Sequence, residues 1–289
     1  MTTSATPLLE AERLTFAYPD GTLALRDLSL RITAGQKIAV LGANGSGKST
    51  LFLQLAGILR PSSGLVRLGG KAVSYDRGGL DLLRRRVGLV FQDPDTQLFA
   101  SSVRQDISFG PLNLGWPEST ARERVSRAIA DTQIEDLVDR PTHLLSYGQK
   151  KRVAIAGILA MEPDVIVADE PTAGLDPEMA DRLVGLLHRL HANGTTIVVS
   201  THDVQLALEW ADVVVVLCDG RVLREGPPEI VFCEPEVLQR AHLKQPLVLD
   251  AYLRLRSAGL VSADARPPLT VSDLVERLAA SRGQPSAAQ

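Results

Sequence analysis

The sequence is poor in aromatic residues and has no excess of basic charge. Aromatic side chains make up 4% of the 289 residues, and the formal net charge is -3 at pH 7. A protein whose main partner is a nucleic acid needs lysines and arginines to neutralise phosphates, and aromatic rings on which bases stack. Both features are scarce in this chain, so we expect no nucleic-acid partner.

Long apolar runs and secretory features are lacking too. The longest apolar runs, such as residues 213–218, fall far short of the roughly 20 residues that span a bilayer. Residues 1–10 have neither the basic segment nor the apolar segment of a signal peptide. The two cysteines, Cys218 and Cys233, have no metal-ligand spacing, and we expect both to be reduced in the cytosol. A role at a membrane would therefore require a membrane-embedded partner.

What the sequence does contain is a regular alternation of strand-like and helix-like segments. Short apolar runs are typical of parallel strands buried on both faces, and they occur at 38–41, 87–91, 165–168, 196–200 and 213–217. Helical patterns lie at 49–59, 119–138, 146–160 and 183–191. In the pattern at 119–138 the candidate buried residues are Val125, Ile129, Ile134 and Leu137. This order predicts an α/β fold whose main sheet is largely parallel.

The two ends of the chain depart from this alternation. Near the start, strand-like segments at 8–10, 14–18 and 28–32, and a hairpin at 64–75 with two glycines at its turn, predict an antiparallel β region. Beyond about residue 234 prolines interrupt the pattern. A final helix through Ala280 is predicted to begin near Thr270, and residues 283–289 are expected to fray.

A glycine-rich loop follows the first buried strand. Residues 42–49 read Gly-Ala-Asn-Gly-Ser-Gly-Lys-Ser, which fits the pattern G-x-x-x-x-G-K-[ST] between a strand and a helix. In that context backbone N–H groups curl around phosphate oxygens, Lys48 reaches the β- and γ-phosphates, and the Ser49 hydroxyl binds Mg²⁺. The alternative is a glycine-rich turn that matches by chance, which the flanking strand and helix disfavour.

Two acidic residues end the apolar strand at 165–168. Asp169 and Glu170 would be costly to bury without a cation or a hydrogen-bond partner. We expect Asp169 to hold Mg²⁺ through water, and Glu170 to orient or deprotonate the water that attacks the γ-phosphate. An acidic turn at Glu170-Pro171 is the alternative, and the upstream phosphate loop makes it the weaker one.

A short motif before the helix narrows the class of phosphate-loop protein. Residues 145–149, Leu-Ser-Tyr-Gly-Gln, resemble LSGGQ, the signature motif of the ABC ATPase family, with Tyr147 in place of the first glycine. Ser146 and the free N–H groups of a helix start suit an anion, and an ordinary helix cap is the alternative. The resemblance implies a head-to-tail homodimer, in which each ATP lies between the phosphate loop of one subunit and the signature of the other.

Further positions follow the family pattern over about residues 8–232. Gln92 matches the glutamine that senses Mg²⁺ and contacts the membrane partner, and Tyr18 matches the aromatic residue that stacks on adenine, with a core tyrosine as the alternative. The implied catalytic residues are Lys48, Glu170 and His202. The implied Mg²⁺ ligands are Ser49, Gln92 and Asp169. The implied ATP contacts are Tyr18, Gly42, Asn44, Gly45, Ser46, Gly47, Lys48, Ser49, Thr50, Gln92, Ser146, Gly148, Gln149 and, at the dimer seam, Asp176.

The implied architecture is an ABC-type nucleotide-binding domain at residues 1–233. It would comprise a mostly parallel sheet with flanking helices, an antiparallel β subdomain, and a helical subdomain at about 93–160. Residues 234–289 would form a partly helical C-terminal extension. The sequence leaves the role of that extension open.

The residues around Gln92 are the most specific part of the resemblance. Residues 91–99 (FQDPDTQLF) and 106–110 (DISFG) resemble the ATPase subunits of energy-coupling-factor transporters, which take up vitamins or transition metals. Residues 142–157 and 241–244 resemble the cobalt and nickel branch. The resemblance thus implies ATP hydrolysis that powers import of cobalt or nickel ions. A vitamin importer of the same type and a soluble ABC ATPase without transport are the alternatives.

The same resemblance implies partners and a location. A second ATPase subunit, a transmembrane coupling subunit and a substrate-binding membrane subunit are expected, at the cytoplasmic face of the cell membrane. We expect the transmission surface near residues 92–110, where Leu98 and Phe99 either receive a partner helix or anchor the loop to the core. His188 and His191 share a helix face, yet we interpret them as ordinary solvated residues rather than cargo ligands.

Overall fold

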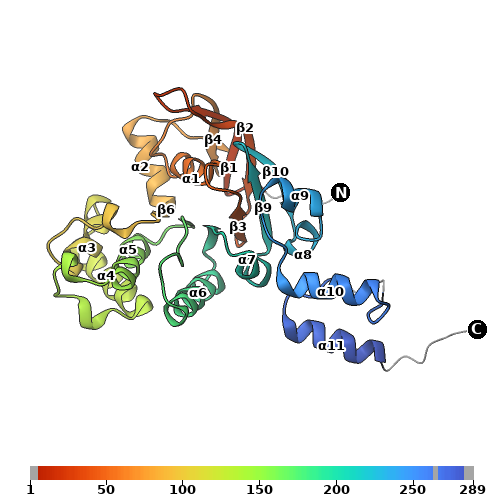
Figure 1. The fold of residues 1–289 in the computed structure, drawn as a ribbon. Coiled ribbons are helices and arrows are strands. Elements are labelled where there is room, and N and C mark those ends of the chain that lie inside the picture. The colour runs from red at the N-terminus through yellow and green to blue at the C-terminus, as the bar shows by residue number, and fades with distance from the viewer. Residues whose placement is uncertain (1–5, 263–265, 283–289) are drawn as a thin grey trace, which may run out of the picture.

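A six-stranded sheet forms the centre of the computed structural model, which describes residues 6–262 and 266–282 (Figure 1). The strand order is β10-β9-β3-β8-β7-β6. All neighbouring pairs are parallel except β10 with β9, so the predicted, largely parallel sheet is confirmed. The strands are β3 (Lys37–Leu41), β6 (Val87–Val90), β7 (Val165–Ala168), β8 (Thr196–Ser200), β9 (Val213–Cys218) and β10 (Arg221–Gly226).

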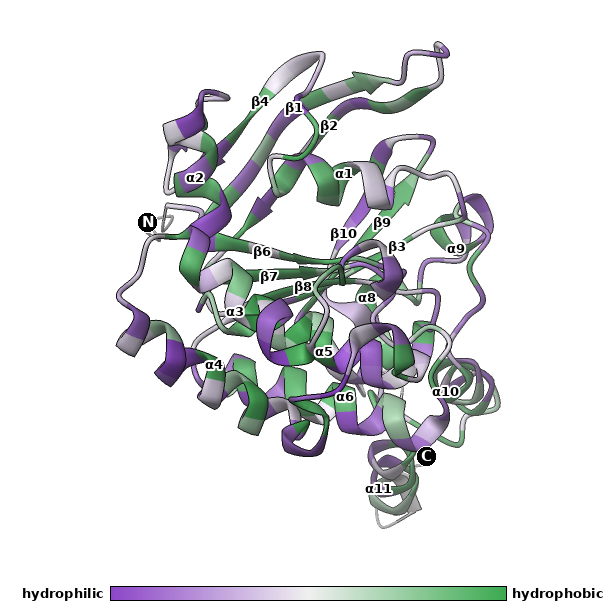
Figure 2. Cartoon of the chain, turned by 90° about the vertical axis from the view of Figure 1, so that its left-hand side faces the viewer, coloured by the Kyte–Doolittle hydropathy of each residue, from purple (hydrophilic) through white to green (hydrophobic). Residues whose placement is uncertain are grey.

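The apolar runs form central strands because both of their faces are buried. Along β7, Ile166 and Ala168 enter one hydrophobic cluster, while Val165 and Val167 enter a second. Successive side chains of a strand point to opposite faces, so the sheet separates two cores. Helix α1 (Lys48–Leu55) covers one face, and α5 (Tyr147–Leu159) and α6 (Pro177–Ala192) cover the other (Figure 2).

The predicted antiparallel β region is a second sheet, with strand order β2-β1-β4-β5. The segments predicted at 8–10 and 14–18 are one irregular strand, because Arg13 has a positive φ of 48° and the pairing shifts register around it. The predicted glycine turn lies between β4 and β5. The strands are β1 (Leu9–Ala17), β2 (Leu23–Ile32), β4 (Ser63–Leu68) and β5 (Lys71–Ala72).

Between β6 and β7 the chain forms the helical part, at the lower left of Figure 1. The long helix predicted at 119–138 is wrong in its extent: α4 (Glu118–Thr132) ends where Gln133 takes a positive φ of 54°. The four residues predicted to be buried there are buried all the same. The remaining elements of this part are α3 (Val103–Asn113) and short 3-10 turns at Pro94–Thr96, Glu135–Leu137 and Thr142–Leu144.

Six further helices complete the described part of the chain, and the sequence patterns indicated only the last of them. Their bounds are α2 (Arg77–Arg86), α7 (Val204–Trp210), α8 (Pro228–Val231), α9 (Pro235–Arg240), α10 (Leu247–Ser257) and α11 (Val271–Arg282). Within the described residues, no helix combines the length and the apolar character that crossing a bilayer requires. The expected frayed segment 283–289 lies outside the described residues.

The first part of the C-terminal extension shares the core of the main sheet. Val237, Leu238, Leu249 and Tyr252 are all less than 9% exposed and belong to the same hydrophobic cluster as β8. Helix α11 packs on α10 and buries Leu274. Residues 235–257 thus share one hydrophobic core with the main sheet. That a separate domain begins at residue 234 stays a prediction.

A truncation series separates these two parts of the extension. A chain that ends at residue 233 should lose several kcal/mol of unfolding free energy or fail to fold, since each buried apolar side chain contributes about 1.5–3 kcal/mol. A chain that ends at residue 262 keeps α10, loses α11 and the segment before it, and should lose roughly 2 kcal/mol or less. Urea unfolding of the three chains measures both differences. Equal stability of the shortest and the full chain would contradict the shared core.

Candidate nucleotide site

The candidate site lies where four neighbouring strands end. In the order β3-β8-β7-β6, parallel strands bring their carboxyl ends to one edge of the sheet. The phosphate loop follows β3, Thr201 and His202 follow β8, the two acids follow β7, and Gln92 comes shortly after β6. Loops at this edge of an open α/β sheet are the usual place for a ligand.

The phosphate loop is held in shape by close contacts that only glycine allows. A Cβ on Gly42 would lie 2.3 Å from the carbonyl oxygen of Leu217, and one on Gly47 would lie 2.8 Å from that of Ala24. Gly47 also has a φ of +104° and begins α1 without a side-chain cap. The first N–H groups of α1 thus have no side-chain acceptor at the cap, which is the arrangement that suits a phosphate.

Lys48 lies folded against the loop from which it comes. Its ammonium donates to the carbonyl oxygens of Gly42 (2.7 Å) and Ala43 (3.1 Å), and the residue is 7% exposed. Burial lowers the pKa of Lys48, while the charges of Glu170 and Asp169 raise it. A positive charge therefore sits at the mouth of the loop, next to two acids.

Asp169 and Glu170 are fixed by one hydroxyl that the sequence analysis did not single out. Ser200, the last residue of β8, donates to Asp169 Oδ1 (2.5 Å) and accepts the backbone N–H of Glu170 (2.8 Å). Asp169 and Glu170 are 8% and 7% exposed. A polar residue at the end of an apolar strand is a weak signal, because its importance depends on which strand lies beside it.

Glu170 lies against His202 in a strained backbone conformation. Its Oε1 is 2.9 Å from His202 Nε2, and its φ is +46°, in the left-handed region. Burial raises the pKa of Glu170, while the charges of His202 and Lys48 lower it. A non-glycine residue in this region costs on the order of 1–3 kcal/mol, so the surrounding contacts must hold it there.

These residues enclose a pocket of about 250 Å³. Tyr18 forms one wall, where its hydroxyl lies 3.0 Å from Thr50 Oγ1 and Phe16 packs edge-on at 5.0 Å. Gly42 and Ser46 lie buried in the loop behind the pocket. The predicted residues that line it are Tyr18, Asn44, Gly45, Gly47, Lys48, Ser49, Thr50, Gln92, Asp169, Glu170 and His202.

The predicted signature and dimer-seam residues lie outside this pocket. Ser146 and Gln149 cap the start of α5 for each other: Ser146 Oγ accepts from Gln149 N (3.3 Å), and Gln149 Oε1 accepts from Ser146 N (2.9 Å). Asp176 caps α6 by accepting from Met179 N (2.8 Å). Gly148 lies in the first turn of α5. One chain thus presents the candidate nucleotide pocket and, separately, a capped helix start.

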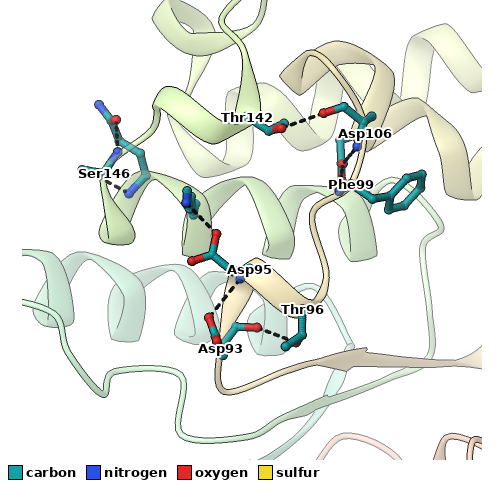
Figure 3. A network of polar contacts seen from close by, with 10 residues as sticks. Asp93, Asp95, Thr96, Phe99, Asp106, Thr142 and Ser146 are labelled. Carbon is teal, nitrogen blue, oxygen red and sulfur yellow. Dashed lines mark hydrogen bonds and ion pairs between the residues drawn. The ribbon is translucent and has the colours of Figure 1, made fainter.

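A polar network fastens residues 93–100, which follow β6, to helices α3 and α5 (Figure 3). Gln97 bridges two elements, because it accepts from Phe91 N (3.1 Å) and donates to the Ala154 carbonyl of α5 (3.1 Å). Asp95 pairs with Lys150 at 2.5 Å. The Asp106 carboxylate accepts the backbone N–H groups of Phe99 and Ala100, and Thr142 donates to the Ala100 carbonyl at 2.6 Å. Residues 93–100 are therefore tied to α3 and α5.

His188 and His191, which we interpreted as ordinary residues rather than cargo ligands, have only local contacts. His191 Nε2 lies 2.9 Å from the Gly35 carbonyl oxygen, and the exposed His188 packs edge-on to Trp210 at 6.4 Å. Among the described residues, no three His, Cys, Asp or Glu side chains are grouped so as to hold a metal ion. The predicted Mg²⁺ ligands Ser49, Gln92 and Asp169 line the pocket above, and only Asp169 is of a residue type counted in such a group.

Known proteins resemble this chain over most of its length. A family model described as "ABC transporter" matches residues 25–173. The cobalt import ATP-binding protein CbiO of Rhodobacter capsulatus is 54% identical over 263 residues, 91% of this chain and 94% of that protein. The energy-coupling factor transporter ATP-binding protein EcfA of Methanocaldococcus jannaschii is 50% identical over 241 residues, 83% of this chain and 86% of that protein.

Solved structures give the same result for the fold. The structure of cbiO1 from Clostridium perfringens, described as part of the ABC transporter complex cbiONQ, has a TM-score of 0.72 and 46% identity, and covers 88% of this chain and 98% of that one. A dimeric ATP-binding cassette in a post-hydrolysis state, bound to ADP and Pi, has a TM-score of 0.70 and 29% identity, and covers 76% of this chain and 98% of that one.

The dual role of Ser200 gives a stability prediction. Ser200→Ala leaves the Glu170 N–H and one Asp169 oxygen without this partner in a buried place, which should lower the unfolding free energy by about 1–3 kcal/mol. Ser108→Ala is the control, because that exposed hydroxyl bonds only the Arg104 carbonyl (2.6 Å) within α3. Its effect should stay within about 0.5 kcal/mol. Denaturant unfolding measures both, and equal losses would contradict the proposed bridge.

Proposed function

Since this chain belongs to the ABC transporter family as an ATPase of the energy-coupling-factor type, we propose that it powers an importer of cobalt or nickel ions. The observation that carries the proposal is the pocket at the strand ends, where Lys48, Asp169, Glu170 and His202 meet. The cargo rests on the cobalt import protein of Rhodobacter capsulatus, which is 54% identical to this chain.

The proposed chemistry assigns one task to each side chain around the γ-phosphate. Lys48 moves from its two carbonyl acceptors to the phosphate oxygens and neutralises their charge. Glu170 orients the attacking water and takes its proton, a role favoured by burial that raises the pKa of its carboxyl. His202, paired with Glu170, contacts the γ-phosphate from the side of β8.

The pocket also has the ligand types that Mg²⁺ prefers. Ser49, Gln92 and Asp169 all line it, and each offers oxygen. Few protein ligands are needed, because Mg²⁺ keeps waters and binds substrate phosphates. The bound ion would neutralise charge on the β- and γ-phosphates. Asp169 is already oriented for this task by the hydroxyl of Ser200.

A homodimer supplies the rest of each site in this proposal. Ser146, Gly148 and Gln149 lie at the start of α5, outside the pocket of their own chain. Helix starts suit anions, so the α5 start of a second copy is fitted to cover the phosphates bound by the first. The support from known structures is the dimeric cassette bound to ADP and Pi, 29% identical to this chain.

An apolar groove of about 410 Å³ supports the proposal that this chain binds a membrane-embedded partner. Phe99 and Phe109 stack edge-on at 4.6 Å beside it and are 63% and 49% exposed. Leu98, by contrast, packs on the core, so it anchors the loop, whereas the exposed Phe99 is available to receive a partner helix. We place the transmembrane coupling subunit here, with the substrate-binding membrane subunit beyond it and this chain at the cytoplasmic face of the membrane.

Glu170→Gln separates ATP binding from hydrolysis. The amide keeps the size of the side chain but takes no proton, so hydrolysis should fall by about 100-fold or more while ATP still binds. ATP should then hold two chains together, which size-exclusion chromatography detects as a dimer. Lys48→Ala is the contrast, because it should weaken ATP binding itself by about tenfold or more. A Glu170→Gln chain that stays monomeric with ATP would contradict the proposed homodimer, in which ATP lies between two subunits.

Transport is tested by co-expression of this chain with a candidate transmembrane coupling subunit and a candidate substrate-binding membrane subunit. Uptake of labelled cobalt or nickel that disappears with Glu170→Gln is the expected result. Absence of metal uptake, with ATP hydrolysis and membrane association intact, would refute the cargo, and labelled vitamins would then be tried. Hydrolysis that neither requires nor drives any membrane partner would instead support a soluble ABC ATPase.

A further inference from the structure

Lys151 is a buried lysine in α5 that has no place in the proposed chemistry at the γ-phosphate. It is 2% exposed and does not line the nucleotide pocket. Its ammonium donates to the carbonyl oxygens of Glu170 (2.8 Å) and Pro171 (3.0 Å). Lysines are rarely buried without a partner, because burial of the charge is costly. The partners of this ammonium are two backbone carbonyls in the turn that carries Glu170.

These two bonds complete a clamp on the backbone of Glu170. Ser200 accepts its N–H at 2.8 Å on one side, and Lys151 binds its carbonyl on the other. Between them Glu170 keeps a φ of +46°, which aims its carboxylate at His202, 2.9 Å away. A strained φ persists only where surrounding contacts fix it. Without Lys151 the carbonyl oxygens of Glu170 and Pro171 lose this side-chain donor.

Tyr147 lies over Lys151 and joins it to two other loops. The ring centroid of Tyr147 is 5.5 Å from the ammonium, a cation–π contact. The hydroxyl donates to the Gln92 carbonyl at 3.2 Å. The ring also lies so close to Gly174 that a Cβ there would be 2.9 Å from it. A glycine at position 147, as in LSGGQ, would provide none of these contacts.

We propose that Lys151, covered by Tyr147, is a positioning residue that holds Glu170 in its hydrolytic conformation. This inference rests on the proposed role of Glu170. Lys151 reaches the carbonyls rather than the carboxylate, so it acts on the backbone that aims the side chain. Since Ser146 caps α5, the helix that is proposed to meet the ATP of a second copy also sets the geometry of its own subunit's glutamate.

Lys151→Met removes the ammonium and both of its hydrogen bonds, and keeps a long side chain in the same space. In the full-length chain we expect kcat for ATP hydrolysis to fall about 10- to 100-fold, because a displacement of roughly 1 Å in a reacting group has effects of that size. The KM for ATP and the affinity for a fluorescent ATP analogue should change less than about twofold, since Lys151 does not line the pocket. Lys151→Arg keeps charge and donors and should restore most of kcat.

Arg152→Met is the matched control. Arg152 is the next residue of α5 and also donates to a backbone carbonyl, that of Gln133 (2.6 Å), but far along the chain from Glu170. The change in melting temperature of Arg152→Met measures how much stability the fold loses with one such bond. Should Lys151→Met fail to fold, Lys151→Gln, which keeps an amide donor, takes its place in the same assays.

The outcomes separate this inference from the proposed function. Native kcat in Lys151→Met, or a parallel loss of ATP affinity, stability and kcat, would overturn the positioning role. Failure of Lys151→Arg to recover kcat, although it folds and binds ATP, would do the same. Undiminished hydrolysis by Glu170→Gln would instead refute the role of Glu170 itself. If Glu170→Gln loses hydrolysis while Lys151→Met keeps its native kcat, the proposed function stands and only the positioning role of Lys151 is refuted.

Discussion

The arrangement of this site follows from the cost of burying two carboxylates at the end of one strand. Asp169 and Glu170 are both less than 9% exposed. A charge taken out of water loses several kcal/mol of hydration unless partners replace it. Here the hydroxyl of Ser200 binds the Asp169 carboxylate, His202 pairs with that of Glu170, and the charges of the buried lysines Lys48 and Lys151 interact with both acids. These groups come from the phosphate loop, from α5, and from β8 and the residues that follow it, so all three must be in place before the acids can be accommodated.

The order of the strands makes that meeting possible. Because β3, β8, β7 and β6 are neighbours, four segments far apart in sequence reach one edge of the sheet. None of the four loops alone makes a pocket. The glycines at 42 and 47 let the phosphate loop pack against Leu217 and Ala24, so even the loop depends on β9 and on the antiparallel sheet. The two sheets are thus joined at the point where the phosphates are expected to bind.

The sequence predicted the strands well because each is an apolar run with both faces covered. Residues 165–168 and 196–200 are strands with those bounds. It predicted α2 and α3 not at all, since α2 contains two adjacent glycines and buries only Leu83, and α3 contains a proline. Ser200 and Lys151 were missed for a different reason. Their importance lies in carbonyls and carboxylates of neighbouring strands and loops, and no spacing in the chain encodes which segment becomes the neighbour.

Helix α5 connects the parts that must act together during hydrolysis. Its side chains and carbonyls bind the segment after β6 through Lys150 and Ala154, and Tyr147 binds the Gln92 carbonyl. The same helix holds the backbone of Glu170 through Lys151. We therefore expect a displacement of residues 92–100 by a partner in the apolar groove to reach α5, and a displacement of α5 to change the contacts that aim Glu170. This helix is the element best placed to couple a membrane partner to hydrolysis, because it carries both sets of contacts.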